Sequence, residues 1–192
     1  MVLDFGLIKS GLFADSELTG LGLGGDLQQS VIAGAGVNWV FDREILATAV
    51  ENINITGLTK THYLLIGTGD VNGVNDWELT LNGITDAEYD FQHLRADGAT
   101  VSSGETANGS SGAVTNNVEA VGFFLVLEVF VDAFNSRLTF FSRWSQVGQM
   151  VLTGGRATDT AASVVSAIKL STGNAAHTFD GRFYLYSVPT RA

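Results

Sequence analysis

The stretch Trp77-Glu-Leu-Thr-Leu81, followed directly by Asn82-Gly83, decides the fold class. Its large apolar residues alternate with Glu78 and Thr80, so one face of an extended segment is apolar and the other is polar. Asn-Gly strongly favours a two-residue hairpin turn, because both residues tolerate a positive φ. The segment therefore predicts a strand, a tight turn and a returning strand over 89–94.

Short strands and turns of the same kind recur from Trp39 onward. Alternation or a short apolar run predicts further strands over 53–55, 62–66, 121–131, 137–144, 164–170 and 183–188. The run 62–66 is expected to end at Gly67-Thr-Gly69. The longest run, 121–131, has 11 residues with Glu128 inside it and is too short for a membrane-spanning helix. Together these elements predict an all-β fold, an antiparallel β-sandwich of the jelly-roll kind.

Two segments depart from this pattern. Residues 98–118 contain one charge and almost no bulky apolar side chain, which predicts a long mobile loop between strands. Phe41 to Glu51 is the only segment for which a helix is an alternative. No internal repeat and no second apolar core is visible. The sequence predicts one sandwich domain over 39–192, preceded by an extended glycine-rich arm over 1–38.

The first 38 residues differ in composition from the rest. They hold eight of the 23 glycines, and no helical or strand period persists in them. Two interpretations remain open: a solvated leader, or an apolar arm that orders only against a neighbouring subunit. The arm is favoured by side chains that a solvated tail seldom carries, namely Leu3, Phe5, Leu7, Ile8, Leu12 and Phe13.

Charge and composition exclude several classes of partner and site. Lys and Arg total 10 against 20 Asp and Glu, a formal net charge of −10. This balance argues against nucleic acid or an anionic membrane as the main partner, because both are bound through Lys and Arg. Cysteine is absent, which excludes disulfides, thiol nucleophiles and cysteine zinc sites. The N-terminal segment has no basic start and no unbroken apolar stretch, so no secretory signal is expected.

Two sequence patterns have the form of catalytic or cofactor sites. Gly20-Leu-Gly22-Leu-Gly24-Gly25 matches the dinucleotide-binding fingerprint, but no apolar strand precedes it, so these glycines are assigned to the arm. Glu88 and Asp90 are two positions apart, as acid/base pairs on a strand would be, with Trp77 and Glu78 expected on an adjacent strand. An ordinary solvated strand face is the favoured interpretation, and the protein is not expected to be an enzyme.

Possible metal ligands are also few. Asp70-Val-Asn72-Gly73-Val-Asn75-Asp76 supplies four oxygen-bearing side chains of the kind that Ca²⁺ takes, but without EF-hand spacing. Turn formation by Asn and Asp is the favoured interpretation, with calcium binding as the alternative. The three histidines, His62, His93 and His177, share no metal-ligand spacing. The sequence thus predicts no catalytic residue, no cofactor and no metal.

Seven aromatic side chains gather in and just after the run 121–131. Packing between two sheets predicts most of them in the core, with an exposed aromatic platform for a sugar as the alternative. They are Phe123, Phe124, Phe130, Phe134, Phe140, Phe141 and Trp144.

Taken in order, several of these segments resemble a broad group of tailed-bacteriophage virion proteins with a jelly-roll or lectin-like β-sandwich. The resemblance covers about residues 39–188 and leaves the arm out. Tyr186-Ser187 stands where the group usually has Tyr-Gly. The segments that carry it are Thr56-Gly-Leu58, Tyr63-Leu-Leu-Ile66, Trp77-Glu-Leu-Thr-Leu-Asn-Gly83, Tyr89, Ile168-Lys-Leu170 and Phe179-Asp-Gly181-Arg-Phe-Tyr-Leu-Tyr186-Ser-Val188.

The resemblance implies a non-enzymatic structural component of the virion, assembled in the host cytoplasm. Capsid decoration (a cement protein) is the favoured role, because the chain has no coiled coil or repeat of a fibre shaft. Its partners would be the major capsid protein or other virion proteins, in a homo-oligomer for which capsid symmetry allows a trimer. The alternative is a tail- or fibre-associated module that binds a carbohydrate receptor, with its site formed by residues 98–118 and 70–76.

Overall fold

The computed structural model describes residues 39–189 except 74, 87 and 119–121, and these described residues form strands and turns without a helix. Accordingly, the described part of the chain holds no helix that could cross a membrane. The predicted arm, including Gly20 to Gly25, lies outside the described residues. The strands are β1 (Val40–Val50), β2 (Asn52–Thr56), β3 (His62–Val71), β4 (Asn75–Leu81), β5 (Tyr89–Asp97), β6 (Thr100–Gly109), β7 (Gly112–Val118), β8 (Gly122–Val131), β9 (Arg137–Gln146), β10 (Gln149–Ala161), β11 (Ala167–Ser171) and β12 (Phe179–Ser187).

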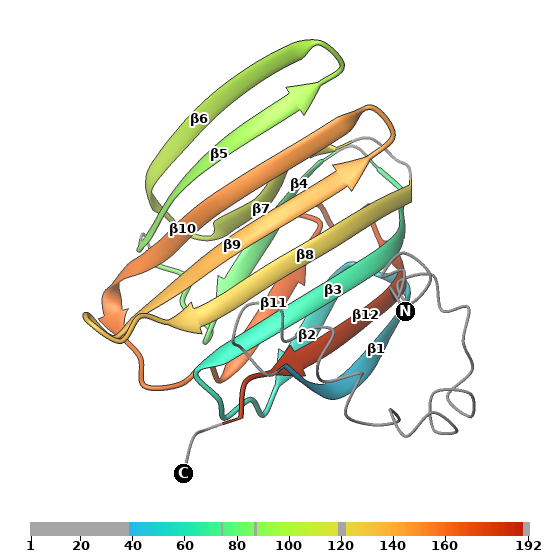
Figure 1. The fold of residues 1–192 in the computed structure, drawn as a ribbon. Helices are drawn as coiled ribbons and strands as arrows, with labels where there is room; N and C mark the ends of the chain where they lie inside the picture. Colours follow the sequence, from blue (N-terminus) through green and yellow to red (C-terminus); the bar gives the residue numbers. More distant parts are fainter. Residues whose placement is uncertain (1–38, 74, 87, 119–121, 190–192) are drawn as a thin grey trace, which may run out of the picture. The chain divides into compact units, whose positions relative to one another are not determined.

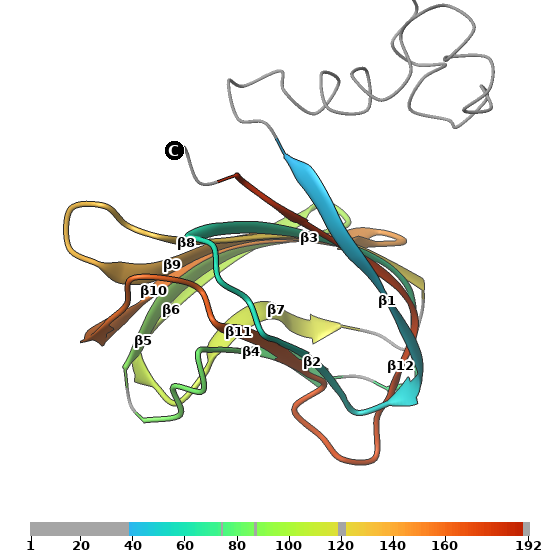
Figure 2. The ribbon, with the colours of Figure 1, turned by 90° about the horizontal axis from the view of Figure 1, so that it is seen from below.

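The strands form two sheets that pack face to face (Figures 1 and 2). Sheet A has eight strands in the order β1-β12-β3-β8-β9-β10-β5-β6, and sheet B has four in the order β2-β11-β4-β7. The strand pairs whose registers are resolved are all antiparallel. The predicted all-β antiparallel sandwich is therefore confirmed. We call the side of sheet A that points away from sheet B the outer face.

The core lies between the sheets and is built from alternate residues of each strand. Trp77, fully buried at its centre, makes edge-to-face contacts with Phe123 and Phe179, both at ring-centroid distances of 4.6 Å. Trp144 closes the group at 6.3 Å from Trp77. Such geometry adds to the stabilisation that burial of the rings already provides. The expected inward set Trp77, Leu79 and Leu81 is confirmed.

The predicted 77–94 hairpin is wrong, although its turn is present. Asn82 and Gly83 both have positive φ, and Ile84 N–H donates to the Leu81 carbonyl. After this turn, however, the chain crosses from sheet B to sheet A. Three hydrogen bonds redirect it. The Asn82 Oδ1 accepts the N–H groups of Ser166 and Ala167 at the start of β11, and the Tyr89 hydroxyl accepts the Leu81 N–H at 2.8 Å. Strand β4 pairs instead with β11 and β7.

Residues 98–118 form two strands rather than a long loop. Strand β6 pairs with β5 along the edge of sheet A, and β7 pairs with β4 along the edge of sheet B. Edge strands with one solvated side need few apolar side chains, because backbone hydrogen bonds hold them in the ladder. Likewise Phe41–Glu51, the segment for which a helix was an alternative, is mostly strand β1, the other edge of sheet A.

Several predicted strands are confirmed with shifted ends, and β10 had not been predicted. Strand β3 runs through Gly67-Thr-Gly69 to Val71 instead of ending there, because Gly67 serves packing and not a turn. A Cβ at Gly67 would lie 2.5 Å from the ring of Phe183 on the neighbouring strand. The predicted strands 164–170 and 183–188 become β11 and the longer β12.

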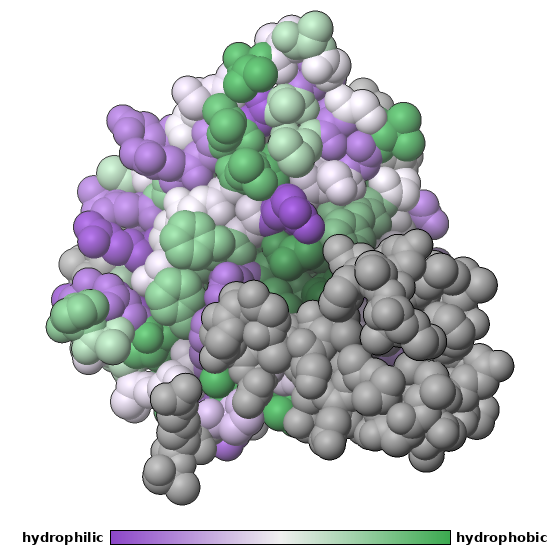
Figure 3. Space-filling view, in the orientation of Figure 1, coloured by the Kyte–Doolittle hydropathy of each residue, from purple (hydrophilic) through white to green (hydrophobic). Residues whose placement is uncertain are grey.

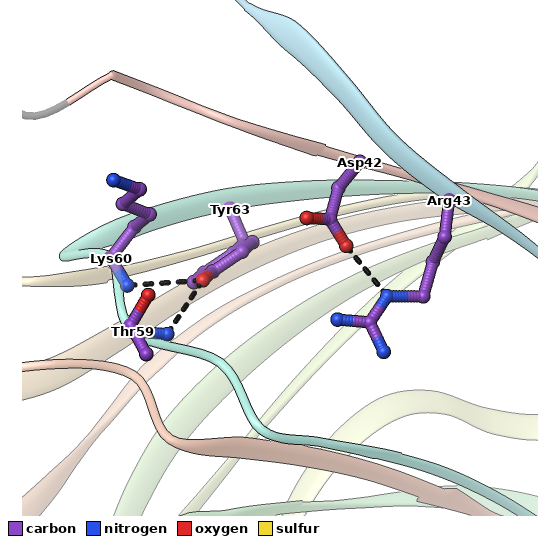
Figure 4. A network of polar contacts seen from close by, with 5 residues as sticks. All are labelled: Asp42, Arg43, Thr59, Lys60 and Tyr63. Atoms are coloured by element: carbon purple, nitrogen blue, oxygen red, sulfur yellow. Dashed lines mark hydrogen bonds and ion pairs between the residues drawn. The ribbon is translucent and has the colours of Figure 1, made fainter.

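The start of β3 is fixed by a buried hydroxyl, shown in Figure 4. Tyr63 accepts the backbone N–H groups of Thr59 and Lys60 at 2.9 and 3.0 Å. These contacts hold the connection from β2 to β3 against the Tyr63 ring. The position of His62, which begins β3, is thereby set. The Asp42–Arg43 ion pair, also drawn in Figure 4, belongs to β1.

Candidate functional site

Two adjoining hollows lie over strands β8, β9, β10, β5 and β6. The larger has a volume of about 1130 Å³ and the smaller about 590 Å³. Both are lined by Gln92, Glu105 and Gly154, so they form one continuous depression that we call the outer-face trough. Figure 3 views this side of sheet A and shows apolar and polar surface interspersed across it.

Strand register explains how distant residues meet in the trough. Glu128 of β8 is opposite Phe141 of β9, which is opposite Gly154 of β10. Gly154 is in turn opposite Gln92 of β5, and Gln92 is opposite Glu105 of β6. Side chains of directly paired residues share one face of a sheet, so this transverse row brings its members together on the outer face.

The floor of the trough is aromatic where β10 lacks a side chain. A Cβ at Gly154 would lie 2.9 Å from the Phe141 ring, so glycine makes the space in which that ring lies across the strand. The Phe141 ring is 53% exposed and stacks with Phe130 at a centroid distance of 6.1 Å. Phe130 in turn contacts the ring of His62 at 5.4 Å. We call His62, Phe130 and Phe141 the aromatic platform.

Polar side chains border this platform. The Nε2 of His62 lies 2.6 Å from Oε1 of Glu128, a contact that fixes the orientation of both groups. Arg143 and Glu105 line the larger hollow, and Arg156 lines the smaller one. The trough thus presents the exposed Phe141 ring beside carboxylate, guanidinium, amide and imidazole groups, which together can hold a ligand with both apolar and hydroxylated surfaces.

The predicted carboxylate pair is not arranged as the glycosidase alternative required. Glu88 precedes the first residue of β5, and the Asp90 carboxylate accepts the Asn108 N–H at 3.0 Å. Trp77 and Glu78, expected on an adjacent strand, lie in β4 of the other sheet. Asp90 does line the smaller hollow of the trough.

The predicted oxygen-rich segment 70–76 and the three histidines do not form a common site. Asn72 bonds Thr178 twice, through its N–H to the Thr178 carbonyl and through Oδ1 to the Thr178 N–H, in keeping with a turn-forming role. His177 packs on Gly73, and His93 lies against Gly104. Among the described residues no group of three or more His, Asp or Glu side chains converges as metal ligands would. Turn formation at 70–76 stays the favoured interpretation, and calcium binding there stays the untested alternative.

The prediction that most of the seven aromatic side chains between 123 and 144 lie in the core is wrong. Phe123, Phe140 and Trp144 are buried, but Phe124, Phe134 and Phe141 are exposed. The signal was present in the pairs Phe123-Phe124 and Phe140-Phe141, because consecutive strand residues point to opposite faces. One ring of each pair had to face outward.

Comparisons with known proteins do not assign a function to this chain. No protein-family model matches the chain, and no curated protein matches it. Among solved structures, the galectin LEC-6 of Caenorhabditis elegans is similar over 73% of this chain and 94% of its own, with 15% identity and a TM-score of 0.35.

Proposed function

We propose that this protein is a non-enzymatic binding module of a tailed-phage virion, associated with the tail or a fibre, which holds a carbohydrate receptor in the outer-face trough. One observation carries the proposal. The Phe141 ring lies over Gly154 with half of its surface exposed, in a hollow bordered by planar polar side chains.

The chemistry of this arrangement suits a sugar. The C–H groups of a pyranose ring form an apolar, slightly electropositive face, which is attracted to the negative face of an aromatic ring. The hydroxyl groups at its rim can donate to Glu128 and Glu105 and accept from Arg143, while Gln92 does both. Ligand sites of roughly 300–1,000 Å³ are typical for small molecules, so the two hollows together provide room for more than one sugar unit.

The virion context rests on the resemblance of residues 39–188 to phage virion proteins. The segments that carry it include parts of β3, β4 and β12, which supply core residues Leu65, Trp77 and Phe183. The formal net charge of −10 supports a location away from packaged DNA.

Capsid decoration is the second candidate, and the exposed apolar side chains of sheet A favour it. Leu94, Phe124, Met150 and Leu152 are each between 38% and 46% exposed. A protein partner could cover these groups as well as the trough, with the arm predicted over 1–38 docking on a neighbouring subunit.

A glycan array probed with the full chain tests the proposal. We expect binding to a defined set of glycans, weakened at least tenfold by Phe141→Ala. Phe134→Ala is the matched control, because Phe134 is fully exposed in the turn between β8 and β9 and lines neither hollow. Absence of glycan binding, together with retention on purified capsids that is lost when residues 1–38 are deleted, would instead support decoration.

A further inference from the structure

Strand β6 (Thr100–Gly109) is a free edge of sheet A, visible at the upper end of the sheet in Figure 1. In the described part of the chain it pairs with β5 on one side only. The free side of such a strand presents backbone N–H and C=O groups at the spacing of another extended chain. The partner that this chemistry recognises is a polypeptide strand.

Among the four edge strands of the described sheets, β6 is the least protected against pairing over Thr100–Thr106, and its own register shift against β5 lies beyond Thr106. Strand β1 carries the consecutive charges Asp42, Arg43 and Glu44, β2 has only five residues, and β7 shifts register twice along β4. Charges, short length and bulges are the usual devices that prevent edge association. Strand β6 has ten residues without proline, lysine or arginine, and its single charge is Glu105.

We propose that β6 pairs antiparallel with β6 of a second copy of this chain, about a twofold axis at Ser103. This register places Glu105 opposite Val101 of the second copy, so the one charge does not face itself. Thr100 then lies opposite Thr106, a β-branched pair of the kind that stabilises antiparallel strands. The side chains of Val101 and Ser103 are exposed and require no rearrangement to pair.

The pairing has a geometric consequence for the outer face. Directly opposite residues of an antiparallel pair point to the same side of a sheet, so the twofold axis is perpendicular to the sheet. The two copies would extend one continuous sheet with both outer-face troughs on the same side. A surface that displays several copies of one ligand would then be bound at two points.

Disulfide trapping tests the pairing directly, because the chain has no cysteine of its own. In the proposed register, Ser103→Cys places two thiols opposite each other at a Cβ separation of roughly 4.5–5.5 Å, close to disulfide geometry. We expect this full-length variant to form a covalent dimer under mild oxidation at least tenfold faster than Thr48→Cys. Thr48 is the matched control, since it is exposed on β1, the opposite edge of sheet A.

Two further measurements fix the register and the stoichiometry. A mixture of Val101→Cys and Glu105→Cys should cross-link into the mixed dimer faster than either variant alone cross-links with itself. Sedimentation velocity of the unmodified chain should show a concentration-dependent monomer–dimer equilibrium. Cross-linking of Ser103→Cys no faster than that of Thr48→Cys, or sedimentation as a monomer at all concentrations or as a trimer, would overturn the proposal.

Discussion

Phe140 and Phe141 are neighbours in strand β9 and have the same side chain, but they lie on opposite sides of sheet A. Phe140 is fully buried between the sheets, whereas Phe141 is 53% exposed on the outer face. Two adjacent glycines of β10 show the same difference between the faces. A Cβ at Gly155 would meet Phe140 and the Asp90 backbone, whereas a Cβ at Gly154 would meet only Phe141. Phenylalanine therefore has two roles in this strand. The Phe140 ring stabilises the fold, and the Phe141 ring is free to contact a ligand.

The largest expected effect is on the inner ring. Phe140→Ala should lower the free energy of unfolding by about 3–5 kcal/mol, the usual cost of deleting a buried phenylalanine. Phe141→Ala should cost less than about 1 kcal/mol, because its ring is half solvated already. Urea denaturation of both variants measures the difference. Equal losses would show that Phe141 is a core residue, and the division between the two faces would be wrong.

The two glycines give the next largest effect. Gly155→Ala forces a methyl group to within 2.7 Å of the Asp90 carbonyl oxygen and of the Phe140 ring, and we expect it to cost about 3 kcal/mol of stability. Gly154→Ala displaces only the exposed Phe141 ring, so its stability should change by less than about 1 kcal/mol. Thermal unfolding compares the two, and a larger loss for Gly154→Ala would contradict the account.

A smaller effect concerns the hydroxyl that joins the two sheets. Burial raises the pKa of Tyr89 to about 12, with a smaller contribution from the Glu88 carboxylate, while the hydrogen bond from Leu81 acts in the opposite direction. Tyr89→Phe removes the acceptor of the Leu81 N–H and should cost about 1–2 kcal/mol at neutral pH.

The pH dependence of this cost has a defined sign. Because the pKa in the folded protein lies above the ordinary value of 10.0, the contribution of neutral Tyr89 to stability is complete below pH 10 and is lost as the pH rises through 12. The stability difference between the wild type and Tyr89→Phe should shrink over that range in alkaline unfolding experiments. Tyr186, whose pKa burial also raises, is present in both proteins and cancels in the difference. A difference independent of pH would contradict the assignment of this cost to the buried Tyr89 hydroxyl.

The inner face could be predicted from sequence far better than the outer one. Alternation in 77–81 and 137–144 identified core residues correctly, because burial leaves a period of two in the chain. The trough left no such signal, since Gly154 meets Gln92 and its hairpin partner Glu105 only through the pairing of β10 with β5, two strands distant in sequence. The composition of 98–118 predicts a loop where β6 forms, because the stability of this edge strand comes from the ladder and not from its side chains. The chain's crossing between sheets at Asn82-Gly83 depends on contacts with Ser166 and Ala167, more than 80 residues away.

The central claim is that the outer face of sheet A, at the aromatic platform, is the binding surface. Backbone amide NMR of the full chain, titrated with the strongest glycan from the array, tests it most directly. The account predicts saturable shifts at Phe141, Gly154 and Gln92, absent in Phe141→Ala, with the resonances of Phe140 and of the 70–76 segment little changed. Shifts confined to residues 70–76, or a titration that Phe141→Ala leaves intact, would contradict it.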